Sequence, residues 1–103
     1  MTNTEKIKAV IDMARRLKDH DRTAANICTT VIITGNSLLE TLDCYYGASE
    51  FIKGVIYGKA SFFNQITLMM LYHFEIHETA KYDYSIDELV RECLERKEGE
   101  KSA

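Results

Sequence analysis

The middle of the chain, residues 23–74, is almost free of charged side chains, and this constrains the fold more than any other feature. Its 52 residues carry only five ionic groups, which are Glu40, Asp43, Glu50, Lys53 and Lys59. The flanks are rich in charge: residues 1–22 carry six basic and four acidic groups, and residues 75–103 carry five basic and nine acidic ones. Two short polar flanks are too small to remove so much apolar surface from water. We therefore expect something outside the chain to cover part of the middle.

The sequence favours helices throughout. It contains no proline in 103 residues, which removes the strongest helix breaker. From Thr4 to near His20, apolar residues recur at helical spacing with charged residues between them, which predicts an amphipathic helix. At the other end, Ser85 and Glu88 form a capping box, in which each side chain satisfies a free amide at the start of a helix. This pattern predicts the beginning of the last helix.

The helices of the middle are less distinct. Residues 27–34 are rich in β-branched side chains, as in a strand, yet their apolar positions also fit one long helix over 23–46. We favour the helix, because a lone strand has no other strand to pair with. A short helix is expected over about 49–57, and another over about 61–80. The predicted fold is all-α, with about five helices around an apolar hairpin of 23–46 and 61–80. The alternative is an α+β fold with a short strand near 27–34.

Length and composition predict one helical domain over residues 1–98, followed by a disordered charged tail over 99–103. The net charge of −3 gives no general attraction to nucleic acid or to anionic membranes. The three cysteines form no CxxC pair, and the first residues lack the apolar stretch of a signal peptide, so we expect a cytoplasmic protein. The longest uncharged runs contain Thr, Asn, Ser or Gln, which argues against a membrane span.

The segment 61–80 is apolar around more than one helical face, which predicts contacts on several sides. A second copy of the chain, or another protein, would supply the missing contacts. Tyrosine is common at interfaces, since it offers a large contact area with a polar tip. The predicted interface residues are Tyr45, Tyr46, Phe62, Phe63, Met69, Met70 and Tyr72.

Two basic residues, Arg15 and Arg16, are candidates for binding a phosphate or an acidic partner surface. The favoured interpretation is a solvated helix face, because cations are stabilised near a helix C-terminus. His73 and His77 are candidate metal ligands, since residues four apart share a helical face. They do not match HExxH, because Glu75 is third in the pattern and faces away. Ordinary partly buried and solvent-facing histidines are favoured, and no cofactor is predicted.

Residues 51–67 resemble a helix-turn-helix, with a small residue at Gly54 and a turn at Gly58. The resemblance is partial, because the apolar positions of the second helix fall on Asn64 and Thr67. Nucleic acid is therefore not the favoured partner. The sequence contains no phosphate-binding loop and no nucleophile-elbow pattern, and its cysteines are typical of small core residues, so we expect no enzyme.

These observations predict a non-catalytic helical protein–protein interaction module. We expect it to form a homodimer or a higher oligomer and to act as a small regulator or inhibitor of a partner protein. Two alternatives stay open. One is a DNA-binding regulator that uses residues 51–67, and the other is a metal- or small-ligand-binding protein that uses His73 and His77.

Overall fold

The computed structural model describes residues 1–45, 47 and 49–96. It contains four α-helices and one 3-10 turn: α1 (Asn3–Leu17), α2 (Arg22–Cys44), α3 (Glu50–His73), η1 (Ala80–Tyr82) and α4 (Ile86–Glu95). No strand occurs in these ranges, so the all-α prediction is confirmed and the strand alternative near 27–34 is wrong. The predicted tail over 99–103, like Tyr46, lies outside the described residues.

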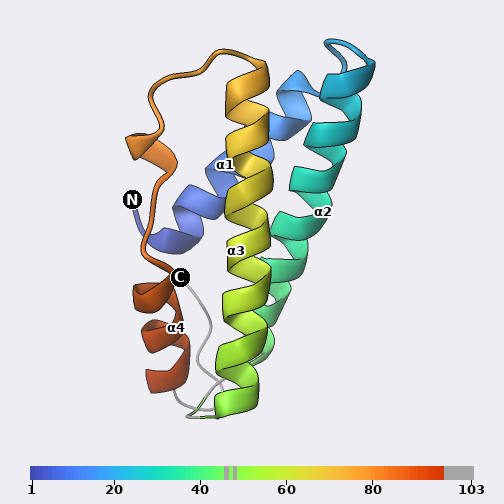
Figure 1. The fold of residues 1–103 in the computed structure, drawn as a ribbon. Helices are drawn as coiled ribbons and strands as arrows, with labels where there is room; N and C mark the ends of the chain where they lie inside the picture. The colour runs from blue at the N-terminus through green and yellow to red at the C-terminus, as the bar shows by residue number, and fades with distance from the viewer. Residues whose placement is uncertain (46, 48, 97–103) are drawn as a thin grey trace.

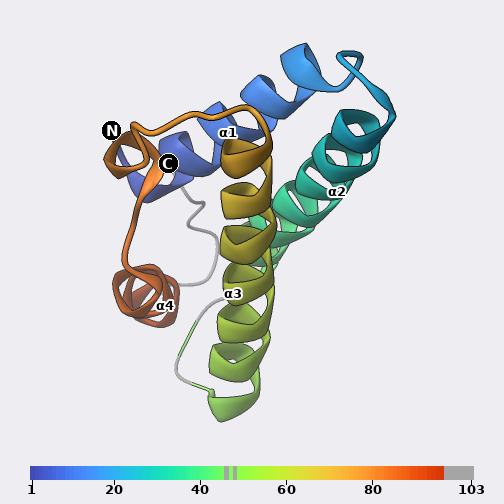
Figure 2. The same ribbon diagram turned by 45° about the horizontal axis from the view of Figure 1, so that its top comes forward.

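The two long helices, α2 and α3, form an antiparallel hairpin at the centre of the fold (Figure 1). The helix α1 packs across α2 on one side of this pair, while α4 packs beside the N-terminal half of α3 (Figure 2). The segment between α3 and α4 returns along α3 and reaches α1 at η1. The molecule is elongated along the hairpin, with extents of 42 × 22 × 20 Å. An apolar hairpin was expected, and it organises the fold.

The core lies between the hairpin and the elements on one side of it. It is formed by apolar side chains from all four helices, including Ile7, Ile11, Val31, Leu38, Ile56, Phe63, Met70 and Leu89. Gly35 of α2 also points into this side of the hairpin, where it meets α1 and α3. The opposite side of α2 and α3 therefore receives no cover from α1.

In the β-branched segment of α2, two threonine hydroxyl groups are satisfied by carbonyls of the same helix. The hydroxyl of Thr30 donates to the carbonyl of Asn26, and that of Thr34 donates to the carbonyl of Thr30, at 2.9 and 2.7 Å. Such bonds to the preceding turn satisfy the hydroxyl groups of Thr30 and Thr34 within the helix. The buried positions Cys28 and Val31 then lie on one face against the core.

The third helix corrects two predictions at once. Residues 49–57 and 61–80 were expected to form separate helices, but one helix runs from Glu50 to His73. Its buried residues, Ile56, Ala60, Phe63, Thr67, Met70 and Leu71, continue at helical spacing past Gly58. A glycine inside a helix costs only about 1 kcal/mol relative to alanine, so a continuous buried stripe outweighs it. The described chain thus has four α-helices where about five were predicted.

The end of α3 was also predicted seven residues too late. The last helical residue is His73, and two backbone hydrogen bonds from the residues after it to the last turn terminate the helix. The amide of Ile76 donates to the carbonyl of Leu71 at 2.8 Å, and the amide of Glu75 donates to that of Tyr72 at 3.1 Å. This is a Schellman motif, and it requires a left-handed residue, here Glu75 with φ of 55°. Glycine is usual at that position, so the sequence gives no sign of the stop.

The helix starts follow local side-chain signals. Ser85 was predicted to cap α4, and its hydroxyl oxygen accepts from the amide of Glu88 at 3.2 Å. A complete capping box begins α1: the Thr2 hydroxyl accepts from the Glu5 amide, and the Glu5 carboxylate accepts from the Thr2 amide. The sequence Thr2-Asn-Thr-Glu5 carries this signal, which places the helix start one residue earlier than expected. Within the described ranges, no helix is long and apolar enough to cross a membrane.

Candidate interaction surface

One face of α3 is uncovered along the whole length of the helix. The residues of this face recur every three or four positions along the helix, and each of them is exposed. We call this surface the α3 outer face; it consists of Phe51, Gly54, Gly58, Phe62, Gln65, Met69 and Tyr72. Four of its members are large apolar or aromatic side chains, and Tyr72 and Phe51 are 86% and 70% exposed. A helix of this pattern lies on the surface of the monomer with its apolar residues in water.

The uncovered surface continues from α3 onto α2. Ile33 of α2 is 63% exposed, and it shares a shallow groove with Phe62 and Gly58 of α3. This groove has a volume of about 290 Å³, and Thr34, Ser37 and Lys59 complete its lining. Gly54 and Gly58 lie open as well, since a Cβ added to either residue would meet no atom within 4 Å. The two glycines therefore leave shallow depressions on a face that is otherwise built from large side chains.

The seven residues of the α3 outer face carry no charge. Lys59 is turned toward α2, where its ammonium group donates to the hydroxyl of Thr41 at 2.6 Å. Lys53 lines a different groove, on the side of α3 that packs against α4, together with Asp87 and Arg91. An apolar face without ions loses little hydration when another surface covers it. The arrangement suits contact with a second apolar surface.

The predicted interface residues divide into three groups. Phe62, Met69 and Tyr72 are exposed on the α3 outer face, and Tyr45, which is 37% exposed, lies at the end of α2. Tyr46 falls outside the described part of the chain. The other two predicted residues are in the core.

Phe63 and Met70 are 1% and 0% exposed, so their inclusion in the interface prediction is corrected. Each follows an exposed residue of the α3 outer face directly in the sequence, and α3 is apolar on both its inner and its outer side. Hydropathy therefore could not distinguish the two stripes. Phe51, Leu68 and Ile33, at 70%, 52% and 63% exposure, are also uncovered and were not among the predicted interface residues.

A second groove opens beside the C-terminal half of α3. It has a volume of about 560 Å³ and lies between Leu68, Leu71 and Tyr72 of α3 and the returning segment with Glu75, Ile76, His77 and Thr79. Tyr72 belongs to both this groove and the α3 outer face, so the two surfaces are continuous. The predicted metal ligand His77 lines this groove from the non-helical segment, four residues beyond the end of α3.

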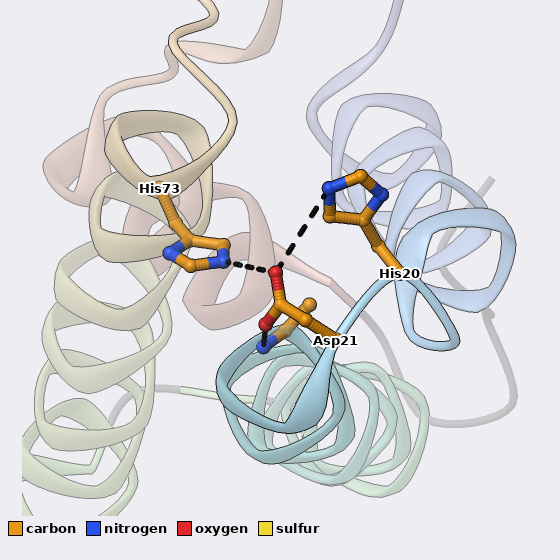
Figure 3. Close-up of polar contacts among 4 residues, drawn as sticks. His20, Asp21 and His73 are labelled. Atoms are coloured by element: carbon orange, nitrogen blue, oxygen red, sulfur yellow. Dashed lines mark hydrogen bonds and ion pairs between the residues drawn. The ribbon is translucent and has the colours of Figure 1, made fainter.

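The two predicted metal ligands do not share a helical face, because α3 ends at His73. His73 instead meets Asp21 at the start of α2, with 3.2 Å between Nε2 and Oδ2 (Figure 3). His20 approaches the same oxygen at 3.9 Å, and both imidazole rings stand edge-on to Phe74. An ionised carboxylate only accepts hydrogen bonds, so Nε2 of His73 is the donor.

Asp21 therefore joins the two ends of the hairpin at one point. Its Oδ1 accepts from the amide of Ala24 at 2.7 Å, which caps α2, while Oδ2 faces His73. The hydrogen bond from the Ala24 amide, followed by His73, holds the pKa of Asp21 below its ordinary value. Among the residues with described positions, no group of three or more His, Cys, Asp or Glu side chains could hold a metal ion. The cluster can act as a structural clasp between α2 and α3.

The remaining predicted sites are placed apart from the α3 outer face. Arg15 and Arg16 are exposed in the last turn of α1, and Arg15 forms an ion pair with Asp12 at 3.4 Å. The alternative of a helix-turn-helix over 51–67 does not fit the structure, because this whole range is helical and Gly58 makes no turn. Cys28 and Cys93 are buried, and burial raises the pKa of both thiols. Cys44 is exposed at the end of α2, so its interpretation as a core residue is wrong.

Comparisons of the chain with protein-family models, with curated proteins and with solved structures found no significant match.

Proposed function

We propose that this protein is a non-catalytic helical interaction module, a small regulator or inhibitor that acts by covering an apolar protein surface with the α3 outer face. The observation that carries this proposal is the uncovered stripe of large apolar residues along α3. Monomeric soluble proteins seldom leave a continuous apolar surface of this extent in water, and where they do it commonly marks a binding site.

The energetics favour a bound partner. Phe51, Phe62 and Met69 are each half exposed or more. Complete burial of a fully exposed side chain of this kind contributes about 1.5–3 kcal/mol, so covering the exposed half or more of each contributes about half of that or more, and several together support a specific complex. The α3 outer face is also rigid, because it belongs to a 24-residue helix that is anchored to the core along its opposite side. A rigid face loses little conformational entropy when it binds.

Site-specific photocrosslinking tests the proposal. The residue at position 62 is replaced by p-benzoylphenylalanine, and the same replacement is made at Lys8, an exposed residue of α1, as a control. Irradiation in the native host should give a defined covalent product heavier than one chain from position 62 and none from position 8. Introducing Met69→Glu into the position-62 variant should remove this product, because it places a charge on the α3 outer face.

The folded state is followed by circular dichroism, so that the loss of a product is not mistaken for unfolding. Absence of any product from position 62, or equal products from both positions, would contradict the proposed interaction surface.

A further inference from the structure

We infer that the α3 outer face binds a second copy of the same chain, with the two α3 helices antiparallel and related by a two-fold axis. This inference rests on the proposed function and identifies the partner. The axis crosses α3 at its midpoint, between Ser61 and Phe62. It follows from three features of the surface: the order of large and small residues on α3, the charges of α2, and the exposed area.

The α3 outer face is complementary to itself in the antiparallel direction. Its small residues, Gly54 and Gly58, lie in the N-terminal half, while Met69 and Tyr72 lie in the C-terminal half. Gly54 is eight residues before Phe62, and Met69 is seven residues after it. Reversing one helix about its midpoint therefore sets Met69 of each copy over the depression at Gly54 of the other. Large side chains that enter such depressions allow two helices to pack closely.

The other positions agree with the same axis. Gly58 comes opposite Gln65, and Phe51 comes opposite Tyr72, so the two exposed aromatic rings at the ends of the face are paired. At the centre, Phe62 of one copy approaches Phe62 of the other. A parallel arrangement would set Gly54 against Gly54 and Met69 against Met69, which leaves a gap at one level and crowding at another. The antiparallel arrangement fills both levels.

The charges of α2 favour the same arrangement. Ile33 lies beside Phe62 across the shared groove, so an axis at the centre of α3 also passes close to Ile33. On the outer side of α2, the exposed residues Arg22 and Glu40 lie about three turns before and two turns after Ile33. In an antiparallel pair, Arg22 of each copy lies near Glu40 of the other. Opposite charges thus meet at both ends, whereas a parallel pair would bring like charges together.

The exposed apolar area provides most of the surface that a standard dimer interface takes from each copy. Phe51, Phe62 and Tyr72 are 70%, 50% and 86% exposed, which at about 200 Å² for an aromatic side chain amounts to roughly 400 Å² per copy. Ile33 and Met69, at 63% and 54%, bring the exposed apolar area to roughly 600 Å² on the same scale. A standard interface takes about 800 Å² from each partner. A surface that is complementary to itself also closes after two copies.

Sedimentation of the intact chain tests whether the second copy binds. The wild type should show a concentration-dependent mass that rises from 11.8 kDa to twice that value. Phe62→Glu should raise the dimer dissociation constant about 100-fold or more, since each copy loses a central anchor and two carboxylates meet at the axis. Lys8→Glu, on the exposed side of α1, should leave it within about threefold. A mass of 11.8 kDa at every concentration overturns the inference.

Cysteine crosslinking tests the orientation. In a Cys44→Ser background, Ser61→Cys and Gln65→Cys are compared under mild oxidation, while the buried Cys28 and Cys93 are left in place. Ser61 lies next to the axis, so its variant should link to itself. The two copies of residue 65 would be offset by seven residues, about 10 Å along the helices, which exceeds the Cα separation of about 7 Å that a disulfide tolerates. Equal self-linking of both variants would indicate parallel helices and overturn the inference.

The two proposals can fail separately. If the position-62 photocrosslink yields a product with another protein while the chain sediments as a monomer, the interaction module stands and the second copy is excluded. If position 62 yields no product and the chain is monomeric, both are excluded. A position-62 product with the mass of two chains, together with self-linking at residue 61 alone, supports the α3 outer face as an interaction surface and the second copy as its occupant.

Discussion

Gly35 of α2 lies directly against the ring of Phe63 in α3. A Cβ on Gly35 would stand 2.8 Å from Cε1 of Phe63, and only 2.6 Å from Cγ1 of Ile11 in α1. Non-bonded carbon atoms prefer separations of about 3.5–4.0 Å, so no side chain fits at this position. Three helices thus come close together at a residue that is itself a poor helix former.

We expect Gly35→Ala to destabilise the fold by about 1–3 kcal/mol, because the added methyl group must displace both Ile11 and Phe63. This loss should exceed the gain of about 1 kcal/mol that alanine brings to a helix. Gly54→Ala is the matched control, since a Cβ there meets nothing within 4 Å in the monomer. Urea unfolding at low protein concentration measures both variants. Equal stability of the two would refute the close packing described for Gly35.

A second prediction concerns the stop of α3. Glu75 has a φ of 55°, a conformation that costs an L-residue about 1–2 kcal/mol and a glycine almost nothing. Glu75→Gly should therefore raise the free energy of unfolding by about 1 kcal/mol, although glycine loses more entropy on folding. Glu78→Gly, at an exposed position of the following segment, should give no gain. Thermal unfolding of both variants checks this, and a destabilised Glu75→Gly protein would show that the left-handed turn is not present.

The sequence predicts those parts of the fold that depend on local signals and periodicity. The range of α2 follows from its apolar spacing, and the start of α4 follows from Ser85 and Glu88. The end of α3 could not be predicted in this way, because the residue in the left-handed conformation is Glu75, at a position where glycine is usual. The continuity of α3 depends on tertiary packing, since the buried residues Ile56, Ala60 and Phe63 hold the helix together around Gly58.

The sequence predicted that an uncovered apolar surface exists, but it identified only some of the residues that form it. The shortage of charge over residues 23–74 indicated uncovered apolar surface, and the structure places such a surface on α3. Which of two adjacent residues faces outward depends on where α1 and α2 pack, so Phe62 and Phe63 could not be separated from the sequence. The contact between Asp21 and His73 joins residues 52 positions apart, and only the fold brings them together.

The clasp at Asp21 predicts a loss of stability in acid. The folded-state pKa of Asp21 lies below its ordinary value of 3.8. Its contribution to stability is therefore fully present above the unfolded-state pKa and is lost as the pH falls below about 4, through the folded-state pKa. Asp21→Asn keeps a good N-cap but removes the carboxylate, so the melting temperature of this variant should depend less on pH between 5 and 2.

Melting curves of both proteins across this range provide the measurement. Asp19→Asn, an exposed neighbour, is the control and should retain the acid dependence of the wild type. If the Asp21→Asn variant lost stability in acid as steeply as the wild type, the carboxylate of Asp21 would not be the group responsible.

The last prediction concerns Tyr84, which packs against the core just before α4. Its hydroxyl oxygen is buried and has no hydrogen-bond partner among the described residues, and burial raises the pKa of the phenol. Folding therefore removes this hydroxyl from water without replacing its hydrogen bond, which is unfavourable. We expect Tyr84→Phe to keep the ring contacts and to raise the free energy of unfolding by up to about 1 kcal/mol.

The alkaline limb of the stability curve gives this prediction a second readout. Because the folded-state pKa of Tyr84 lies above its ordinary value of 10.0, the wild type should lose stability as the pH rises beyond 10, when the unfolded chain ionises first. Tyr84→Phe should lose less over the same range. A destabilised Tyr84→Phe protein with an unchanged alkaline limb would show that the hydroxyl is hydrogen-bonded in the folded state.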